Sequence, residues 1–168
     1  MKKIILFAVF LSPFLSAYCK AEDNPRLDLL LSMIKPTVLK LQVIPTRSHP
    51  LIYELTRGSK IELKITQYEG LGGYEWGNIE REYIIPIKLE ENKKILDLLH
   101  HALELTLRDE TMGMDGSIWI LESKLYQPLK ITIWSPEYKM VSRGYENLVK
   151  LEKYLKSLNE KYYTKNKS

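Results

Sequence analysis

The sequence predicts an α+β domain: an antiparallel sheet of about five or six strands with two main helices packed on one face. Several short segments alternate apolar and polar residues with a period of two, which is typical of half-buried strands. Two longer segments repeat apolar residues at helical spacing instead. Because strands come in runs rather than alternating strictly with helices, an antiparallel sheet is favoured. The 168 residues, 45% of them hydrophobic, suffice for a single domain over 22–160.

Four strands are expected before the first long helix. The first begins at Thr37, and the others span 51–55, 61–66 and 79–87. Segment 61–66 is the clearest of them, since each apolar residue is followed by a polar one. Pro86 cannot donate to a strand ladder, so it places the end of the fourth strand at an edge of the sheet.

Helices and a hairpin complete the domain. An apolar cluster between residues 22 and 36 predicts a short helix that a proline ends. Residues 90–107 place their apolar side chains on one broad face and predict the first long helix. Residues 117–123 and 129–134 predict a hairpin. The last helix, about 145–162, carries a narrow leucine stripe that we expect to dock on the sheet.

Residues 1–21 have the three parts of a secretory signal peptide. Two lysines give a positive start, residues 4–15 form an apolar run, and small residues lead up to Ala21. A helix of this run would be only about 18 Å long against a hydrocarbon core of about 30 Å, so it is too short for a transmembrane anchor. Cleavage after Ala21 would leave a periplasmic or secreted protein. Lipoprotein anchoring at Cys19 is the alternative, and Tyr18 disfavours it because that cleavage needs a small residue before the cysteine.

Removal of the leader changes the charge balance. Lys2, Lys3 and Lys20 leave with it, which lowers the Lys and Arg total from 25 to 22 against 21 Asp and Glu residues, a net charge of +1. Overall charge therefore does not indicate a nucleic-acid partner, and we expect none. We also expect no transmembrane segment after cleavage. The basic C-terminal tail, 161–168, is interpreted as solvated.

The histidines do not have metal-ligand spacing. His100 and His101 are adjacent, so on a helix they point about 100° apart and cannot hold one ion together. They are placed to pair with Asp97 and Glu104 on the solvated helix face. His49 has no partner nearby in the sequence. We predict neither a metal nor a cofactor.

Two features of nucleophilic catalysis are missing from the sequence as well. It has no nucleophile elbow and, after cleavage, no thiol. Paired carboxylates are the catalytic alternative, because Asp115 with Glu122, or Glu69 with Glu75 and Glu80, could supply the acid and base of a glycosidase-like site. The favoured interpretation is that these are turn and surface carboxylates.

Segment 68–78 has the composition of a recognition loop. Four glycines permit close backbone approach, while aromatic residues offer large contact areas. The candidate binding residues are Tyr68, Tyr74, Glu75 and Trp76. Two interpretations stay open, because Tyr74 and Trp76 could instead fold back to cap the core.

A second group of distinctive residues begins at Asp115. Asp115-Gly116 is a turn signal, and Trp119 and Trp134 would lie on the two arms of the predicted hairpin. Core packing is the favoured interpretation for these rings, and Trp119 is predicted to be buried. Asp115 and Glu122 are kept as candidate binding residues.

These motifs resemble those of a family of small uncharacterised bacterial proteins, many of them exported. The resemblance rests on Gly-Gly-Tyr-x-x-Gly at 72–77, Asp-Gly-x-x-Trp-x-Leu-Glu at 115–122 and Trp-Ser-Pro at 134–136, followed by a leucine-rich helix. It covers roughly residues 51–158. The resemblance brings no activity, substrate or cofactor with it.

The sequence leads to three hypotheses. The first is a non-catalytic periplasmic protein that binds another envelope or secreted protein through the aromatic loop and the hairpin; an immunity or inhibitor protein against an envelope-acting toxin or hydrolase is one version. The second is a small envelope hydrolase that uses paired carboxylates. The third is a structural envelope component without a cleft. Small size, predicted export and the missing catalytic motifs favour the first.

Overall fold

The computed structural model describes residues 36–104, 111–113 and 115–165. The predicted signal peptide, the helix predicted before Pro36 and residues 166–168 of the predicted tail lie outside the described residues. Residues 161–165 of that tail belong to the last helix instead, and Lys161 and Tyr162 contact Glu91, so they are not part of a separate solvated tail.

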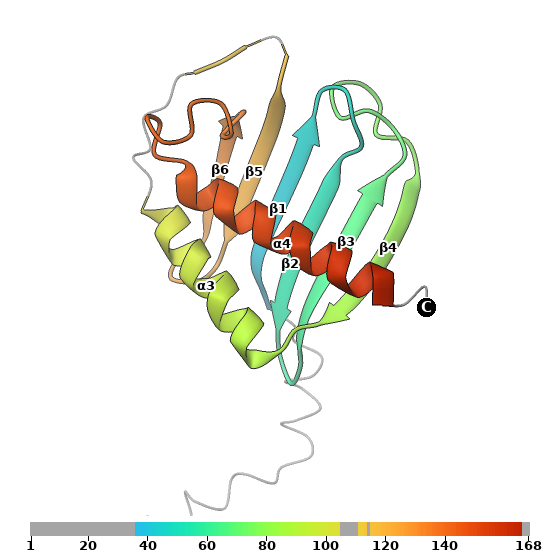
Figure 1. Ribbon diagram of the computed structural model, residues 1–168, viewed down its shortest axis with the longest axis vertical. Coiled ribbons are helices and arrows are strands. Elements are labelled where there is room, and N and C mark those ends of the chain that lie inside the picture. The colour runs from blue at the N-terminus through green and yellow to red at the C-terminus, as the bar shows by residue number, and fades with distance from the viewer. Residues whose placement is uncertain (1–35, 105–110, 114, 166–168) are drawn as a thin grey trace, which may run out of the picture. The chain divides into compact units, whose positions relative to one another are not determined.

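Six strands form one antiparallel sheet, shown in Figure 1. Their order across the sheet is β4-β3-β2-β1-β5-β6, so β1 is a central strand that pairs with both β2 and β5. The strands are β1 (Thr37–Pro45), β2 (Leu51–Arg57), β3 (Ile61–Tyr68), β4 (Ile79–Pro86), β5 (Ser117–Ser123) and β6 (Leu129–Trp134).

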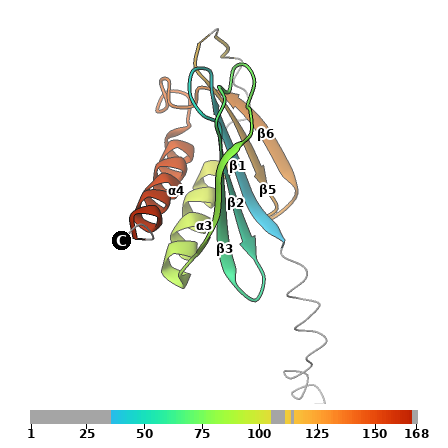
Figure 2. The same ribbon diagram turned by 90° about the vertical axis from the view of Figure 1, so that its right-hand side faces the viewer.

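Both long helices cover the same face of the sheet, as Figure 2 shows. Helix α3 (Leu89–Leu103) and helix α4 (Glu146–Lys165) also contact each other. The core joins fully buried sheet residues such as Leu39 and Tyr53 to helix residues such as Leu99. The leucine stripe predicted on the last helix faces this core. Leu148, Leu151, Leu155 and Leu158 are buried, and Tyr162 is partly buried.

The predicted fold class is confirmed. Every predicted strand is present, and the hairpin of β5 and β6 has the expected bounds. Pro86 ends the edge strand β4, as its missing backbone N–H requires. Helix α3 ends at Leu103, before the predicted end at Leu107, and residues 105–110 lie outside the described ranges.

The face of the sheet that the helices leave open carries a row of alternating charges. Residues of this row lie opposite one another in successive strands: Lys64, Glu54, Lys40, Glu122 and Lys130. Lys40 Nζ lies 3.1 Å from Glu54 Oε1, and Lys130 Nζ lies 3.0 Å from Glu122 Oε1. Cross-strand pairs of opposite charge stabilise a solvated sheet face. Glu122, a candidate binding residue, therefore has a structural partner here.

Glu91 joins the start of α3 to the C-terminal part of α4. Its carboxylate accepts hydrogen bonds from Lys161 Nζ at 2.8 Å, from Tyr162 Oη at 3.2 Å and from the Lys88 backbone N–H at 3.1 Å. Burial acts to raise the pKa of this carboxyl, but the hydrogen bonds from Lys161 and Lys88 outweigh it and hold the pKa below its usual value. The charged form of Glu91 is therefore part of the folded state.

Candidate functional site

Four connections gather at one end of the sheet, which we call the loop end. They are the β1–β2 turn, the β3–β4 loop, the segment before β5 and the β6–α4 connection: residues 46–50, 69–78, 111–113 with 115–116, and 135–145. Because neighbouring strands are antiparallel, alternate connections emerge at the same end of the sheet. Figure 1 shows these connections at the top of the view. The β2–β3 and β5–β6 turns lie at the opposite end.

Backbone hydrogen bonds fix the β3–β4 loop on the β1–β2 turn. The Gly72 N–H donates to Ser48 O at 3.1 Å, and the Gly73 N–H donates to Thr46 O at 3.3 Å. A Cβ atom on Gly72 would lie only 2.4 Å from Pro45 O, so a side chain cannot be accommodated at this approach. Gly72 and Gly73 therefore let the loop backbone pack closely on the β1–β2 turn, which holds the loop in one position.

The candidate residues of this loop differ in their exposure. Tyr74 is 75% exposed, and Glu75 beside it is exposed as well. Trp76 is half-buried, and its ring meets the Tyr68 ring edge-on with centroids 5.0 Å apart. Each interpretation of the loop thus applies to a different residue. Tyr74 is available for contact, whereas Trp76 and Tyr68 stabilise the loop by packing on each other.

Asp115 lies at the other side of the β1–β2 turn. Both the N–H and the Oγ1 of Thr46 donate to Gly116 O at 2.8 Å, and Arg47 Nη2 lies 3.2 Å from Asp115 Oδ1. An open depression of about 340 Å³ is lined by Pro45, Thr46, Arg47, Ser48, Asp115 and Gly116. The turn thus brings two motifs that are far apart in the sequence to one surface. Sequence reasoning did not identify Arg47 or the turn, because nothing in its local pattern indicates this role.

A buried hydrogen-bond network supports the Asp-Gly turn. The Ser117 N–H donates to Ser135 Oγ at 2.8 Å. Ser117 Oγ donates to Glu137 Oε1 at 2.7 Å and accepts from Trp119 Nε1 at 2.9 Å. Trp119 is 3% exposed, which confirms its predicted place in the core. The Asp-Gly and Trp-Ser-Pro motifs are therefore the two sides of one hydrogen-bonded hairpin end.

Trp134 departs from the expected core position. It lies opposite Ile118 in the register of β5 and β6, whereas Trp119 lies opposite Ile133, so the two indoles occupy opposite faces of the hairpin. Trp134 is half-buried, and a Cβ atom on Gly113 would lie 2.3 Å from its Cζ2 atom. The segment before β5 thus passes directly over this ring, which packs beneath the loop end.

Arg143 organises the β6–α4 connection, and sequence reasoning missed it. Its guanidinium donates to the carbonyl oxygens of Trp134, Ser135 and Tyr138 at 2.7, 2.7 and 2.8 Å. Ser135 has a φ of 37°, a conformation that costs serine energy unless its surroundings hold it. No local pattern could identify this role, because all three acceptors are backbone groups.

Exposed apolar side chains are concentrated at the loop end. Among the described residues, seven of the ten exposed large hydrophobic side chains lie in these connections or at the strand ends next to them: Leu71, Tyr74, Ile79, Met112, Ile118, Tyr138 and Val141. The other three are Ile84, Leu89 and Tyr126. Single exposed apolar residues are normal on any surface, but their concentration in one region is typical of an interaction site.

Asp115 and Glu122 do not form a catalytic pair, and Glu69 and Glu80 are each engaged in a side-chain hydrogen bond. Glu122 lies five residues beyond the start of β5, about 16 Å along the strand from the Asp-Gly turn, which is too far for a glycosidase-like pair with Asp115. Glu69 Oε1 accepts from Asn78 Nδ2 at 2.8 Å, and Glu80 Oε2 accepts from Gln67 Nε2 at 2.6 Å. These contacts hold the loop and the strand next to it.

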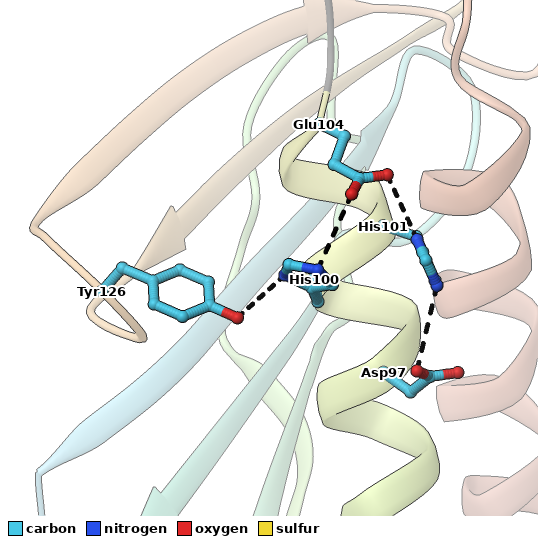
Figure 3. A network of polar contacts seen from close by, with 5 residues as sticks. All are labelled: Asp97, His100, His101, Glu104 and Tyr126. Atoms are coloured by element: carbon cyan, nitrogen blue, oxygen red, sulfur yellow. Dashed lines mark hydrogen bonds and ion pairs between the residues drawn. The ribbon is translucent and has the colours of Figure 1, made fainter.

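A separate polar cluster occupies the last turn of α3, as Figure 3 shows. His101 Nδ1 lies 3.1 Å from Glu104 Oε2, and His101 Nε2 lies 3.9 Å from Asp97 Oδ1. His100 Nδ1 lies 2.8 Å from Tyr126 Oη in the β5–β6 turn. The contact of His101 with Asp97 is one that the helical spacing predicts, and so is the contact of His100 Nε2 with Glu104 Oε1 at 3.6 Å. The contact of His101 with Glu104 was not predicted. Within the described part of the chain, no group of three His, Cys, Asp or Glu residues has a geometry that could hold a metal ion.

No protein-family model, curated protein or solved structure matches the chain. In the ranges that the structure describes, no helix has both the length and the apolar content needed to cross a membrane.

Proposed function

We propose that this protein is a non-catalytic binding protein of the cell envelope and that its loop end contacts another protein. The observation that carries the proposal is the concentration of exposed apolar side chains at the loop end, where backbone hydrogen bonds fix the β3–β4 loop and the β6–α4 connection. Tyrosine side chains contribute strongly to binding energies. A loop that is already ordered loses little conformational entropy when it binds.

The polar groups of the loop end fit the same role. Arg47 and Asp115 form an ion pair with side chains that are 77% and 71% exposed. Such an exposed pair contributes little to folding stability, so its groups are free to exchange partners on binding. Charged groups beside apolar anchors set the orientation and the rate of association more than its strength.

One concrete version of the proposal is an immunity or inhibitor protein that neutralises a toxin or hydrolase of the envelope. The predicted export, the small size and the resemblance to small exported bacterial proteins support it. A hydrolase is less well supported, because Asp115 and Glu122 are separated along β5 and because Glu69 and Glu80 are engaged in structural hydrogen bonds. The hypothesis of a structural envelope component gives no role to the exposed apolar side chains at the loop end.

The test removes the two exposed apolar side chains of the β3–β4 loop. Leu71→Ala with Tyr74→Ala should leave the free energy of unfolding within about 0.5 kcal/mol of the wild type, because both side chains are exposed. The same variant should no longer capture the envelope protein that the wild type retains in pull-down from the producing cells.

The matched control removes one leucine and one tyrosine side chain at the opposite end of the sheet. Leu89→Ala with Tyr126→Ala removes side chains that are 76% and 71% exposed, and capture should persist. Persistent capture by the loop variant, or equal loss in the control, would show that the loop end is not the binding surface.

A further inference from the structure

The end of the sheet opposite the loop end carries exposed cations around the point where the chain enters β1. The four exposed cations are Arg57, Lys60, Lys88 and Lys124. They come from the β2–β3 turn, the junction between β4 and α3, and the β5–β6 turn. We call this group the basic end.

Backbone hydrogen bonds place these cations around the first residues of β1. The Arg57 N–H donates to Pro36 O at 3.2 Å, and the Lys124 N–H donates to Val38 O at 3.0 Å. The chain thus enters the folded unit between Arg57 and Lys124. On the other side of the β2–β3 turn, the Ile87 N–H donates to Ile61 O at 2.9 Å, which brings Lys88 close to Lys60.

The basic end is not neutralised by ion pairs. None of its four cations forms an ion pair with another described residue, whereas Lys40, Lys64 and Lys130 on the open sheet face are each paired with a glutamate. Five carboxylates lie within three residues of these cations in the chain. Glu54, Glu91 and Glu122 are paired with other lysines, Lys40, Lys161 and Lys130. The other two are Glu62 and Glu90, so the four cations exceed the remaining anions at this end. The loop end has the opposite balance in its β3–β4 loop, where Glu69 and Glu75 face no lysine or arginine of the same loop.

Two large apolar side chains are exposed beside these cations. Leu89 at the start of α3 is 76% exposed, and Tyr126 in the β5–β6 turn is 71% exposed. Cations next to exposed aliphatic and aromatic side chains are typical of surfaces that adsorb to a bilayer interface. Each cation close to an anionic lipid surface adds a favourable increment to binding.

We propose that the basic end binds a membrane surface that carries anionic lipid headgroups. The loop end then faces away from the membrane, and the first residues of β1 lie on the membrane side. This orientation goes beyond the proposed function, since it assigns a second surface and a lipid partner. Four cations and two apolar side chains support reversible adsorption rather than insertion.

The test uses the mature chain from Glu22 and sedimentation with lipid vesicles. Binding is expected to phosphatidylethanolamine vesicles with about 30% phosphatidylglycerol, but not to pure phosphatidylcholine, at about 50 mM NaCl. Arg57→Glu with Lys60→Glu should weaken vesicle binding at least about tenfold. Arg57→Gln with Lys60→Gln should give a smaller loss, and binding should fall steeply towards about 500 mM NaCl.

The control makes the same change of charge elsewhere. Lys153→Glu with Lys156→Glu alters exposed positions on α4 and should keep vesicle binding within about twofold of the wild type. Thermal melts establish that each variant is folded. No binding to the anionic vesicles, equal loss in the α4 control, or equally tight binding to a short DNA duplex would each overturn the lipid assignment. None of these outcomes bears on capture by the loop end.

Discussion

Replacement of Trp119 by alanine should lower the free energy of unfolding by about 3 to 5 kcal/mol. The indole is 3% exposed, and its Nε1–H donates to Ser117 Oγ. Alanine would therefore leave a cavity in the core beneath the loop end and would remove one member of the network with Ser135 and Glu137. Urea denaturation followed by circular dichroism measures the change.

Trp134→Ala is the matched comparison on the same hairpin. Trp134 is half-buried on the opposite face, so its loss should cost less, about 1 to 2 kcal/mol. A cost below about 1 kcal/mol for Trp119→Ala, or a larger cost for Trp134→Ala, would show that the two rings have the reverse roles.

Replacement of Arg143 by methionine should lower the free energy of unfolding by about 2 to 4 kcal/mol, since hydrogen bonds from charged donors contribute more than neutral ones. Methionine keeps much of the apolar stem but leaves the carbonyls of Trp134, Ser135 and Tyr138 without the guanidinium. Ser135 would also lose a contact that holds its positive φ. Urea denaturation gives the global change.

Hydrogen exchange then locates the effect of Arg143→Met. Protection should fall first in the β6–α4 connection and not in β2 or β3. Arg143→Lys should be intermediate, because lysine keeps the charge but cannot present the planar fork to three acceptors. If methionine leaves both stability and protection unchanged, Arg143 does not organise this connection.

The sequence pattern predicted the elements of the fold well because each strand and helix buries one face. In 61–66 the period of two marks alternate residues for the core, and Leu63 and Ile65 are indeed buried. The stripe of α4 was equally informative, since a seam of leucines can only be buried on one side.

The order of the strands could not be predicted in the same way. Alternation indicates which face of a strand is buried, but it does not indicate its neighbours. The pairing of β1 with β5 joins Leu39 to Ser123 and Pro45 to Ser117 across a long stretch of chain. Nothing local in 37–45 shows that it forms the centre of the sheet.

The composition of the sequence identified the candidate loop, but it predicted the exposure of only some of the side chains in it. Glycine and aromatic content identified the β3–β4 loop, yet composition did not separate exposed Tyr74 from half-buried Trp76. Exposure depends on the backbone path that Gly72 and the β1–β2 turn impose. Glu122 shared a motif with Asp115, but the strand between them carries it away from the loop end.

Site-specific photo-cross-linking in the producing cells tests most directly whether the loop end is the binding surface. A photoreactive aromatic amino acid replaces Tyr74 in one strain and Tyr126 in another, since these tyrosines are 75% and 71% exposed at opposite ends of the sheet. We expect one discrete protein adduct from position 74 and none from position 126. Protein adducts from position 126 alone, or no protein adduct from position 74, would show that the loop end is not the binding surface.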